Sequence, residues 1–284
     1  MASKGLALRV ADVVDADVGG WESVVPRAEK LGLEAPVVVD ATAAEDGAGH
    51  VEWLRRGWSV VTANKKPLAG KQAVYDVLAA ARDDAGRRRY FHETTVGAGL
   101  PVIRTLQDLL ETGDEVREIR AALSGTMGFI FSECGRGRSF AEAVAKAKAR
   151  GYTEPDPRDD ISGTDIARKA LILGRMLGNR LEPADVEVES LADVPPDEVD
   201  SRLKKAAARG AAPRFLATIR PDGIRVGLED VPRVDPFAAL DGPENLIVFR
   251  TARYAAAPLA VRGPGAGAAV TAAGLFADII RAAV

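Results

Sequence analysis

Cysteine and histidine are nearly absent from this sequence: its 284 residues include one cysteine, Cys134, and two histidines, His50 and His92. A single cysteine excludes an internal disulfide bond, and the three residues together are too few for a Cys/His zinc site, which takes four ligands. This cysteine usage is typical of reducing compartments. We therefore expect an intracellular, cytoplasmic protein without structural zinc.

Long apolar segments are also missing. Residues 1–6 contain no apolar stretch followed by a cleavage site, which a secretory signal peptide requires. No run of about 18 uninterrupted apolar residues, the length of a membrane-spanning helix, occurs anywhere. The sequence predicts neither export nor a transmembrane helix.

The charges are nearly balanced, with a formal net charge of −3. This leaves no broad basic surface for nucleic acids or anionic membranes, so small molecules are the expected ligands. Hydrophobic residues make up 47% of the chain, which is enough for one large domain or two modest ones with proper cores. We expect two domains.

Apolar runs and helical patterns alternate through the amino-terminal third of the chain, which predicts a parallel α/β sheet. The expected strands are residues 6–14, 35–40, 58–62 and 90–95. The expected helices are residues 21–30, 49–56 and 71–85.

The rest of the chain has a different pattern. Ser139, Glu142 and Gly151 have the spacing of N-cap, third position and C-terminal glycine, and predict a helix over residues 140–150. A Pro-rich, acidic stretch over residues 181–200 separates it from a helix at 201–208. The turn Pro221-Asp222-Gly223 predicts antiparallel pairing of its flanking strands. The expected strands are residues 115–124, 214–220, 223–228 and 246–254, with a further strand-like run at 259–262.

Acidic residues gather before a helix predicted to begin at Ser162, and Asp165 and Lys169 lie one turn apart on it. The structural interpretation makes Ser162 the N-cap and Asp165 the third position of a capping box. An exposed pair of charges at this spacing contributes only about 0.3–0.5 kcal/mol, so stability hardly explains the other carboxylates. A polar pocket and a solvated surface both remain open. The carboxylates concerned are Glu154, Asp156, Asp159 and Asp160.

Three further segments have both a functional and a plain interpretation. Asn64-Lys65 follows a predicted parallel strand, where α/β sheets bind ligands, although an exposed loop lysine is the simpler interpretation. Residues 93–101 turn through two glycines, which can expose carbonyl oxygens to a cation or can simply join a strand to a helix. Residues 263–268 match G-x-G-x-x-A, but no acidic residue about 20 positions on follows, so this is not the dinucleotide fingerprint. Its glycines would let backbone N–H groups approach an anion.

Together these segments closely resemble homoserine dehydrogenase over nearly the whole chain. The matching motifs are Thr62-Ala63-Asn64-Lys65-Lys66, residues 93–101, Ser124-Gly125-Thr126-Met127 and residues 151–169. The resemblance implies an α/β fold with a Rossmann-like parallel sheet and an α+β substrate and dimerisation domain with a mixed or antiparallel sheet. It places the nucleotide-binding domain at residues 1–97, completed by 264–284, and the substrate domain at 98–263.

The resemblance also implies an activity, the NAD- or NADP-dependent interconversion of L-homoserine and L-aspartate 4-semialdehyde. This reaction belongs to threonine, methionine and isoleucine biosynthesis, and the implied assembly is a homodimer or homotetramer. The implied catalytic residues are Lys169, as general acid/base, and Lys65, which assists near the nicotinamide. The implied substrate residues are Glu154, Asp165, Asp160 and Gly151. The implied cofactor residues are Thr42, Lys65, Gly265 and Gly267. A sodium-like ion would bind the carbonyls of Glu93, Val96, Ala98 and Leu100.

The sequence departs from the family at its start. Members begin with a strand and a G-x-G-x-x-G turn that seats the pyrophosphate, whereas Met1 falls where the second strand would begin. Regulatory ACT-like and aspartate kinase regions are missing as well. On this basis we expect weakened cofactor binding, and two explanations stay open. Either the start is misassigned and the full protein is an ordinary enzyme, or the chain is an impaired homologue that acts as a substrate-binding or partner subunit.

Overall fold

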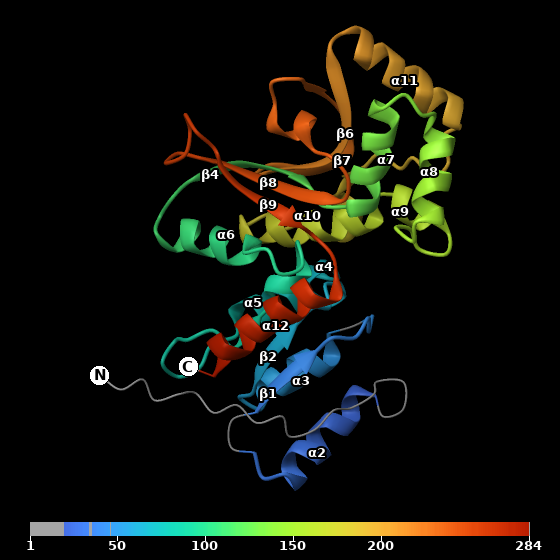
Figure 1. Cartoon of the computed structure of the whole chain (residues 1–284). Helices are drawn as coiled ribbons and strands as arrows, with labels where there is room; N and C mark the ends of the chain where they lie inside the picture. The colour runs from blue at the N-terminus through green and yellow to red at the C-terminus, as the bar shows by residue number, and fades with distance from the viewer. Residues whose placement is uncertain (1–19, 34–35, 46, 284) are drawn as a thin grey trace.

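The computed structural model describes residues 20–33, 36–45 and 47–283. The strand predicted at residues 6–14 lies outside this part of the chain. The described residues form two sheets, one of three strands and one of six, which occupy two lobes (Figure 1). No helix in the described residues is long and apolar enough to cross a membrane.

The parallel-sheet lobe has the strand order β1-β2-β3, and both pairings are parallel as predicted. Its last strand is shorter than expected because residues 93–95 turn into a 3-10 helix, and α5 is shorter because the chain reverses after Ala81 through a bridge between Arg82 and Arg88. The strands are β1 (Val37–Asp40), β2 (Ser59–Thr62) and β3 (Tyr90–Phe91). The helices are η1 (Trp21–Ser23), α2 (Val24–Lys30), α3 (Ala48–Arg55), α4 (Lys66–Ala69), α5 (Gln72–Ala80) and η2 (Glu93–Thr95).

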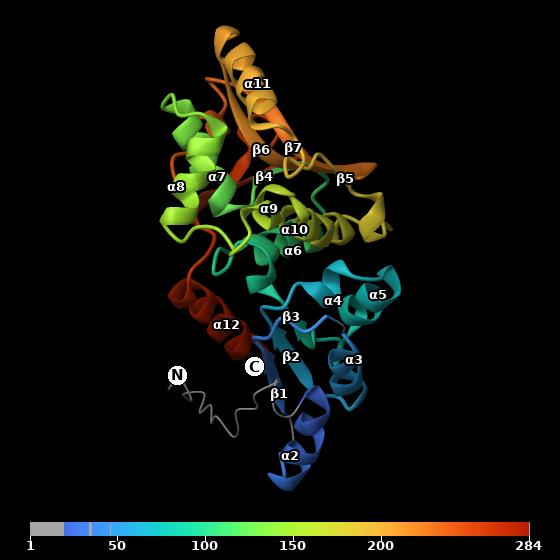
Figure 2. The ribbon, with the colours of Figure 1, turned by 90° about the vertical axis from the view of Figure 1, so that its right-hand side faces the viewer.

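The carboxyl-terminal helix α12 (Ala268–Ala282) returns from the other lobe and packs on the parallel sheet and on η2 (Figure 2). Two glycines make this close packing possible. A Cβ on Gly99 would lie 2.2 Å from the carbonyl oxygen of Val270, and one on Gly274 would lie 2.5 Å from Cγ2 of Thr94. Any larger side chain at either position would push α12 away from the turn between the lobes.

The mixed-sheet lobe has the strand order β5-β7-β6-β4-β8-β9. All its pairings are antiparallel except β5 with β7. The hairpin of β6 and β7 turns over Pro221 and Asp222 as predicted, since Arg220 pairs with Gly223. The short strand β5 lies in the stretch predicted to be only a connection. The strands are β4 (Val116–Ala122), β5 (Glu187–Val188), β6 (Ala211–Arg220), β7 (Gly223–Pro232), β8 (Glu244–Thr251) and β9 (Leu259–Pro264).

The helices of this lobe surround the core. The capping box of Ser139 and Glu142 forms as predicted, and Gly151 follows the end of α8 with φ +70°. Helix α11 begins at Pro196 rather than at residue 201, because proline suits the first turn of a helix and Asp197 and Glu198 favour its positive end. The helices are α6 (Val102–Glu111), α7 (Gly125–Gly135), α8 (Phe140–Ala149), α9 (Pro157–Ile161), α10 (Thr164–Met176), η3 (Pro183–Asp185), α11 (Pro196–Ala208) and η4 (Pro236–Ala239).

Candidate active site

Two lysines and one aspartate meet where the lobes join. Lys65 follows β2 and immediately precedes α4, whereas Asp165 and Lys169 lie on the first turns of α10, which packs beside α4. Nζ of Lys65 is 3.0 Å from Oδ1 of Asp165, and Nζ of Lys169 is 2.8 Å from Oδ2. We call these three residues the Lys65–Asp165–Lys169 cluster. It brings together chain segments that are 100 residues apart.

The predicted capping role of Asp165 is wrong. Helix α10 starts at Thr164, its N-cap is Gly163 with φ +76°, and no side chain caps it. Ser162 is instead the C-cap of the short helix α9, and its own backbone is helical. Its hydroxyl oxygen accepts a hydrogen bond from the N–H of Thr164. The N-cap of a capping box typically has an extended backbone, whereas Ser162 keeps the helical conformation in which α9 ends. Asp165 is therefore free to bind the two lysines.

The three side chains of the cluster interact strongly through their charges. Burial alone would raise the pKa of Asp165, but the ammonium groups of Lys169 and Lys65 outweigh it and lower that pKa to about 2. Nζ of Lys169 also donates to the carbonyl oxygen of Leu123, at 2.9 Å, and its side chain is only 14% exposed. An ammonium has three N–H donors, so two protein acceptors leave one donor for a ligand oxygen. Lys169 is thus mostly buried and held by two protein acceptors, unlike a solvated surface lysine.

The acidic loop before α9 has its own supports. Oδ2 of Asp160 accepts the N–H of Glu154 at 2.8 Å, and the hydroxyl of Thr126 lies 3.1 Å from Oδ1 of Asp160. Glu154 itself is exposed. No hydrogen bond or ion pair within the described ranges joins Glu154 or Asp160 to the Lys65–Asp165–Lys169 cluster. The structure therefore supports the role of Asp160 in fixing the loop, while the substrate contacts of Glu154, Asp160 and Gly151 stay predictions.

The loops after β1 and β2 are tied to each other. The amide of Asn64 donates to the carbonyl oxygen of Ala44 at 2.9 Å, and the ammonium of Lys66 donates to that of Ala43 at 2.8 Å. Thr42 is exposed in the first loop, where its N–H donates to Oδ1 of Asp40 at 2.8 Å. Thr42 and Lys65 thus stand on linked loops at the carboxyl edge of the parallel sheet, which is where such sheets bind ligands.

A buried polar network lies beneath these loops, and no sequence motif indicated it. Nε2 of His50 is 2.8 Å from Oδ2 of Asp40, and Nδ1 is 2.9 Å from the hydroxyl oxygen of Tyr90. Burial opposes ionisation of Asp40, but hydrogen bonds from His50 and Thr42 hold its pKa well below the usual range. Asp40 therefore stays ionised and fixes the Thr42 loop from below.

Replacing His50 by leucine should destabilise the protein by about 1–3 kcal/mol, because it leaves the buried carboxylate of Asp40 without its main partner. Urea unfolding would measure the free energy of unfolding. The matched control is Glu52→Ala in the same helix, which removes only an exposed ion pair with Arg56 and should change stability by at most about 0.5 kcal/mol. Equal effects of the two substitutions would contradict the structural importance of the network.

Residues 93–101 form the junction between the lobes. The carboxylate of Glu93 accepts the N–H groups of Ile103, at 2.8 Å, and Arg104, at 3.1 Å, and thereby caps α6, while Asp278 of α12 accepts the N–H of Glu93. Burial, reinforced by the nearby charge of Asp278, raises the pKa of Glu93 to about 7. Ala98 takes up a left-handed conformation, with φ +53°, which turns the peptide chain sharply.

The predicted cation ligands are backbone carbonyls of this junction. The carbonyl oxygens of Glu93 and Leu100 already accept N–H groups of Val96 and Val102, at 3.5 and 2.8 Å. Side chains offer no alternative, since no group of three or more His, Cys, Asp or Glu residues suited to a metal occurs in the described part of the chain. The cation site stays a prediction.

Gly265 and Gly267 belong to the segment that joins β9 to α12, and this segment passes between the lobes (Figure 1). A Cβ on Gly265 would fall 1.9 Å from the side-chain amide nitrogen of Asn245, so a larger residue there would require the Asn245 side chain to move. Gly267 has φ +127°, and no side chain caps the start of α12. The first N–H groups of α12 are thus not engaged by a cap and suit an anionic group such as a pyrophosphate. This arrangement fits a dinucleotide at the junction.

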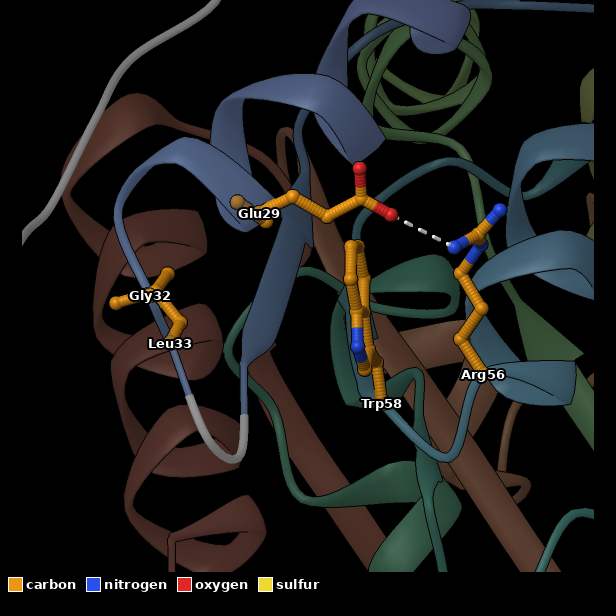
Figure 3. Close-up of a pocket in the computed structure, with 6 residues that line it drawn as sticks. Glu29, Gly32, Leu33, Arg56 and Trp58 are labelled. Atoms are coloured by element: carbon orange, nitrogen blue, oxygen red, sulfur yellow. Dashed lines mark hydrogen bonds and ion pairs between the residues drawn. The ribbon is translucent and has the colours of Figure 1, made fainter.

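A separate surface hollow of about 420 Å³ is lined by other residues, among them Glu29, Arg56 and Trp58 (Figure 3). Glu29 and Arg56 form an ion pair of 3.2 Å across it, beside Trp58. Trp58 directly precedes β2 and Leu33 lies before β1, so the hollow is at the amino ends of the strands. Ligands of parallel sheets bind at the opposite ends, and the hollow is not the candidate active site.

Comparison with known proteins identifies both parts of the chain. Residues 101–280 match the family described as homoserine dehydrogenase, and residues 11–92 match its NAD-binding domain. A chloroplastic bifunctional aspartokinase/homoserine dehydrogenase of Zea mays is 44% identical over 265 residues, which are 86% of this chain and 29% of that protein. The homoserine dehydrogenase of Saccharomyces cerevisiae is 38% identical, over 87% of this chain and 75% of the yeast protein. The chain thus spans less than a third of the bifunctional relatives.

Solved structures agree with the fold. A Candida auris protein described as of unknown function superposes with a TM-score of 0.84 and 31% identity, over 92% of this chain and 80% of that one. A hyperthermophilic archaeal homoserine dehydrogenase in complex with NADPH superposes with a TM-score of 0.71 and 28% identity, over 90% and 73%. These likenesses support a Rossmann-like parallel sheet joined to a mixed-sheet domain.

Proposed function

The chain belongs to the homoserine dehydrogenase family, and from this premise we propose that it interconverts L-homoserine and L-aspartate 4-semialdehyde with NAD or NADP. The observation that carries the proposal is the Lys65–Asp165–Lys169 cluster. It places a mostly buried lysine with a spare N–H beside a carboxylate that two ammonium groups keep ionised, where α10 packs beside α4. An alcohol dehydrogenation needs such a proton-transferring group next to the reacting carbon.

Lys169 handles the proton in this proposal. When the aldehyde is reduced, the ammonium group of Lys169 gives a proton to the carbonyl oxygen of the substrate. When the alcohol is oxidised, the neutral amine of Lys169 takes the proton of the substrate hydroxyl. The nicotinamide, when bound, supplies or accepts the hydride. Lys65 approaches from the other lobe and shares Asp165 as counterion, so that both lysines are held in place by one carboxylate. Asp165 also contacts the hydroxyl end of the substrate. Glu154 binds the substrate ammonium group. Asp160 supports Glu154, and Gly151 forms the back of the pocket.

The residues proposed to hold the cofactor lie on both sides of the junction. Thr42 and Lys65 would hold it from the linked loops, and Gly265 and Gly267 would do so from the segment that leads into α12. The two domains are residues 1–97 with 264–284, and residues 98–263; the packing of α12 on the parallel sheet supports this division. A monovalent cation on the carbonyls of Glu93, Val96, Ala98 and Leu100 would fix the turn between them.

The cellular setting is also proposed. The enzyme acts in the cytoplasm, in threonine, methionine and isoleucine biosynthesis, as a homodimer or homotetramer built on the mixed sheet. The low net charge of −3 supports small-molecule substrates rather than nucleic acid.

We expect the purified chain to bind L-homoserine and, at saturating NADP or NAD, to reduce the cofactor in a homoserine-dependent reaction. Weakened cofactor binding raises the cofactor concentration that is needed but leaves the Lys65–Asp165–Lys169 cluster in place. Calorimetry would measure the binding and absorbance at 340 nm the reduction, with L-serine as the control substrate. L-serine is one carbon shorter, so it cannot reach both Glu154 and the cluster and should give a far lower rate. Absence of both binding and turnover with L-homoserine would contradict the proposed function.

A further inference from the structure

Arg175 is a buried cation that the proposed chemistry does not use. It lies on α10, and its side chain is 0% exposed. Its guanidinium donates to three backbone carbonyl oxygens: Nη1 to Leu68 at 2.6 Å, and Nη2 to Gly70 and to Leu181, both at 2.7 Å. The guanidinium also lies over the ring of Tyr75, 5.4 Å from its centre. Leu68, Gly70 and Tyr75 belong to the parallel-sheet lobe, so these contacts of Arg175 join the two lobes.

The carbonyls that Arg175 binds belong to the element that carries Lys65. Leu68 is in α4 and Gly70 ends that helix, while Lys65 stands directly before its first residue. Helix α4 is therefore held at both ends by α10: Lys65 pairs with Asp165 near one end, and Arg175 binds the carbonyls at the other. Both views show α4 at the junction of the lobes, below α10 (Figures 1 and 2).

Burying the guanidinium of Arg175 costs free energy that burying an apolar side chain in the same place would not. Burial lowers the pKa of Arg175, and the nearest carboxylate, on Glu182, is 3.9 Å away and largely exposed. Apolar residues of similar volume are often at least as stable as a buried charge. The planar fork of a guanidinium, however, fixes several acceptors in one geometry, which neither an apolar residue nor a lysine can do. Carbonyls at a helix end carry partial negative charge and suit such a cation.

We propose that Arg175 is a positioning residue for the reaction: it locks α4 against α10 and thereby sets the place of Lys65 relative to Asp165 and Lys169. This inference rests on the proposed function, in which both lysines serve one reacting centre. Because the lysines come from different lobes, a small sliding of α4 would separate them. Arg175 prevents that sliding.

A double-mutant cycle tests the proposal, with kcat for homoserine oxidation measured in the full chain and in the variants Arg175→Lys, Lys65→Met and the double variant. Arg175→Lys should lower kcat by about 10- to 100-fold, since misplacement by about 1 Å can cost that much, with little change in KM for homoserine. In the Lys65→Met background the same substitution should change kcat less than about 2-fold, because the residue it positions is already gone. The matched control is Arg180→Met, which breaks an exposed contact between the lobes, 2.8 Å to Asp76, and should leave kcat within about 2-fold.

The outcomes separate the two levels of inference. An inactive wild-type chain would count against the proposed function. An active wild-type chain in which Arg175→Lys lowers kcat equally in both backgrounds, or not at all, would overturn the positioning role alone. Arg175→Gln keeps two N–H donors and replaces Arg175→Lys if the latter does not fold. Failure of both to fold would also contradict the proposal, since it assigns Arg175 to geometry rather than to fold stability.

Discussion

Replacing Lys169 by methionine should lower kcat for homoserine oxidation by about 10²- to 10⁴-fold, the usual contribution of a positioned acid/base group. Methionine has nearly the same length and fills the same space, but it can neither donate to Leu123 nor exchange a proton with the substrate oxygen. The loss should affect both directions of the reaction, because one nitrogen gives and takes the same proton. Steady-state rates at saturating substrate would measure it.

The control for this prediction is Lys204→Met. Lys204 is an exposed residue of α11 in the mixed-sheet lobe, and its replacement should leave kcat unchanged. Circular dichroism and urea unfolding would confirm that both variants are folded. A Lys169→Met protein with at least a third of the wild-type kcat would show that another group handles the proton. In that event Lys65, the other lysine of the cluster, would be the first candidate.

Replacing Gly99 by alanine should destabilise the protein by about 1–3 kcal/mol or more, the range for overpacking a close contact. The added Cβ would lie 2.2 Å from the carbonyl oxygen of Val270, which belongs to the backbone of α12 and has no rotamer by which to escape. Helix α12 must then move away from the turn at residues 93–101. Since Gly265 and Gly267 lie in the segment that leads directly into α12, we expect NADP affinity to fall together with stability.

Gly135→Ala is the matched control for this effect. Nothing lies within 4 Å of a Cβ at Gly135, which is the last residue of α7, so alanine there should be neutral or stabilise by up to about 1 kcal/mol. Urea midpoints of the two variants give the comparison directly. If Gly99→Ala proved as stable as Gly135→Ala, the tight packing of α12 on the turn would be wrong.

Local structure was predictable where neighbouring residues determine it. The capping box at Ser139 and the hairpin over Pro221 and Asp222 both form as predicted, because each depends on groups a few residues apart. The prediction failed at Ser162, where the same capping pattern is present but α9 occupies the preceding residues. A capping motif does not reveal whether the residues before it already belong to another helix, as those of α9 do here.

The interactions beneath the site were not predictable for a different reason. Asp40, His50 and Tyr90 are ordinary residues of separate elements. The pairing of the parallel strands, together with the packing of α3 on the sheet, brings them into one network. Arg175 likewise occurs as one arginine in a helix with several charges. The acceptors that make it unusual are backbone carbonyls, which every sequence contains and no motif marks.

The sequence by itself determined the chemistry of each segment: a carboxylate and a lysine one helical turn apart, a lysine after a parallel strand, and glycines before the last helix. The pitch of a helix and the direction of a strand suffice for that, since both are set by local geometry. Only the tertiary structure decided that Lys65 shares Asp165 with Lys169, and that Arg175 and the glycine contacts of α12 hold the lobes together. Those contacts join residues far apart in the chain, and their geometry depends on how two separately formed sheets pack.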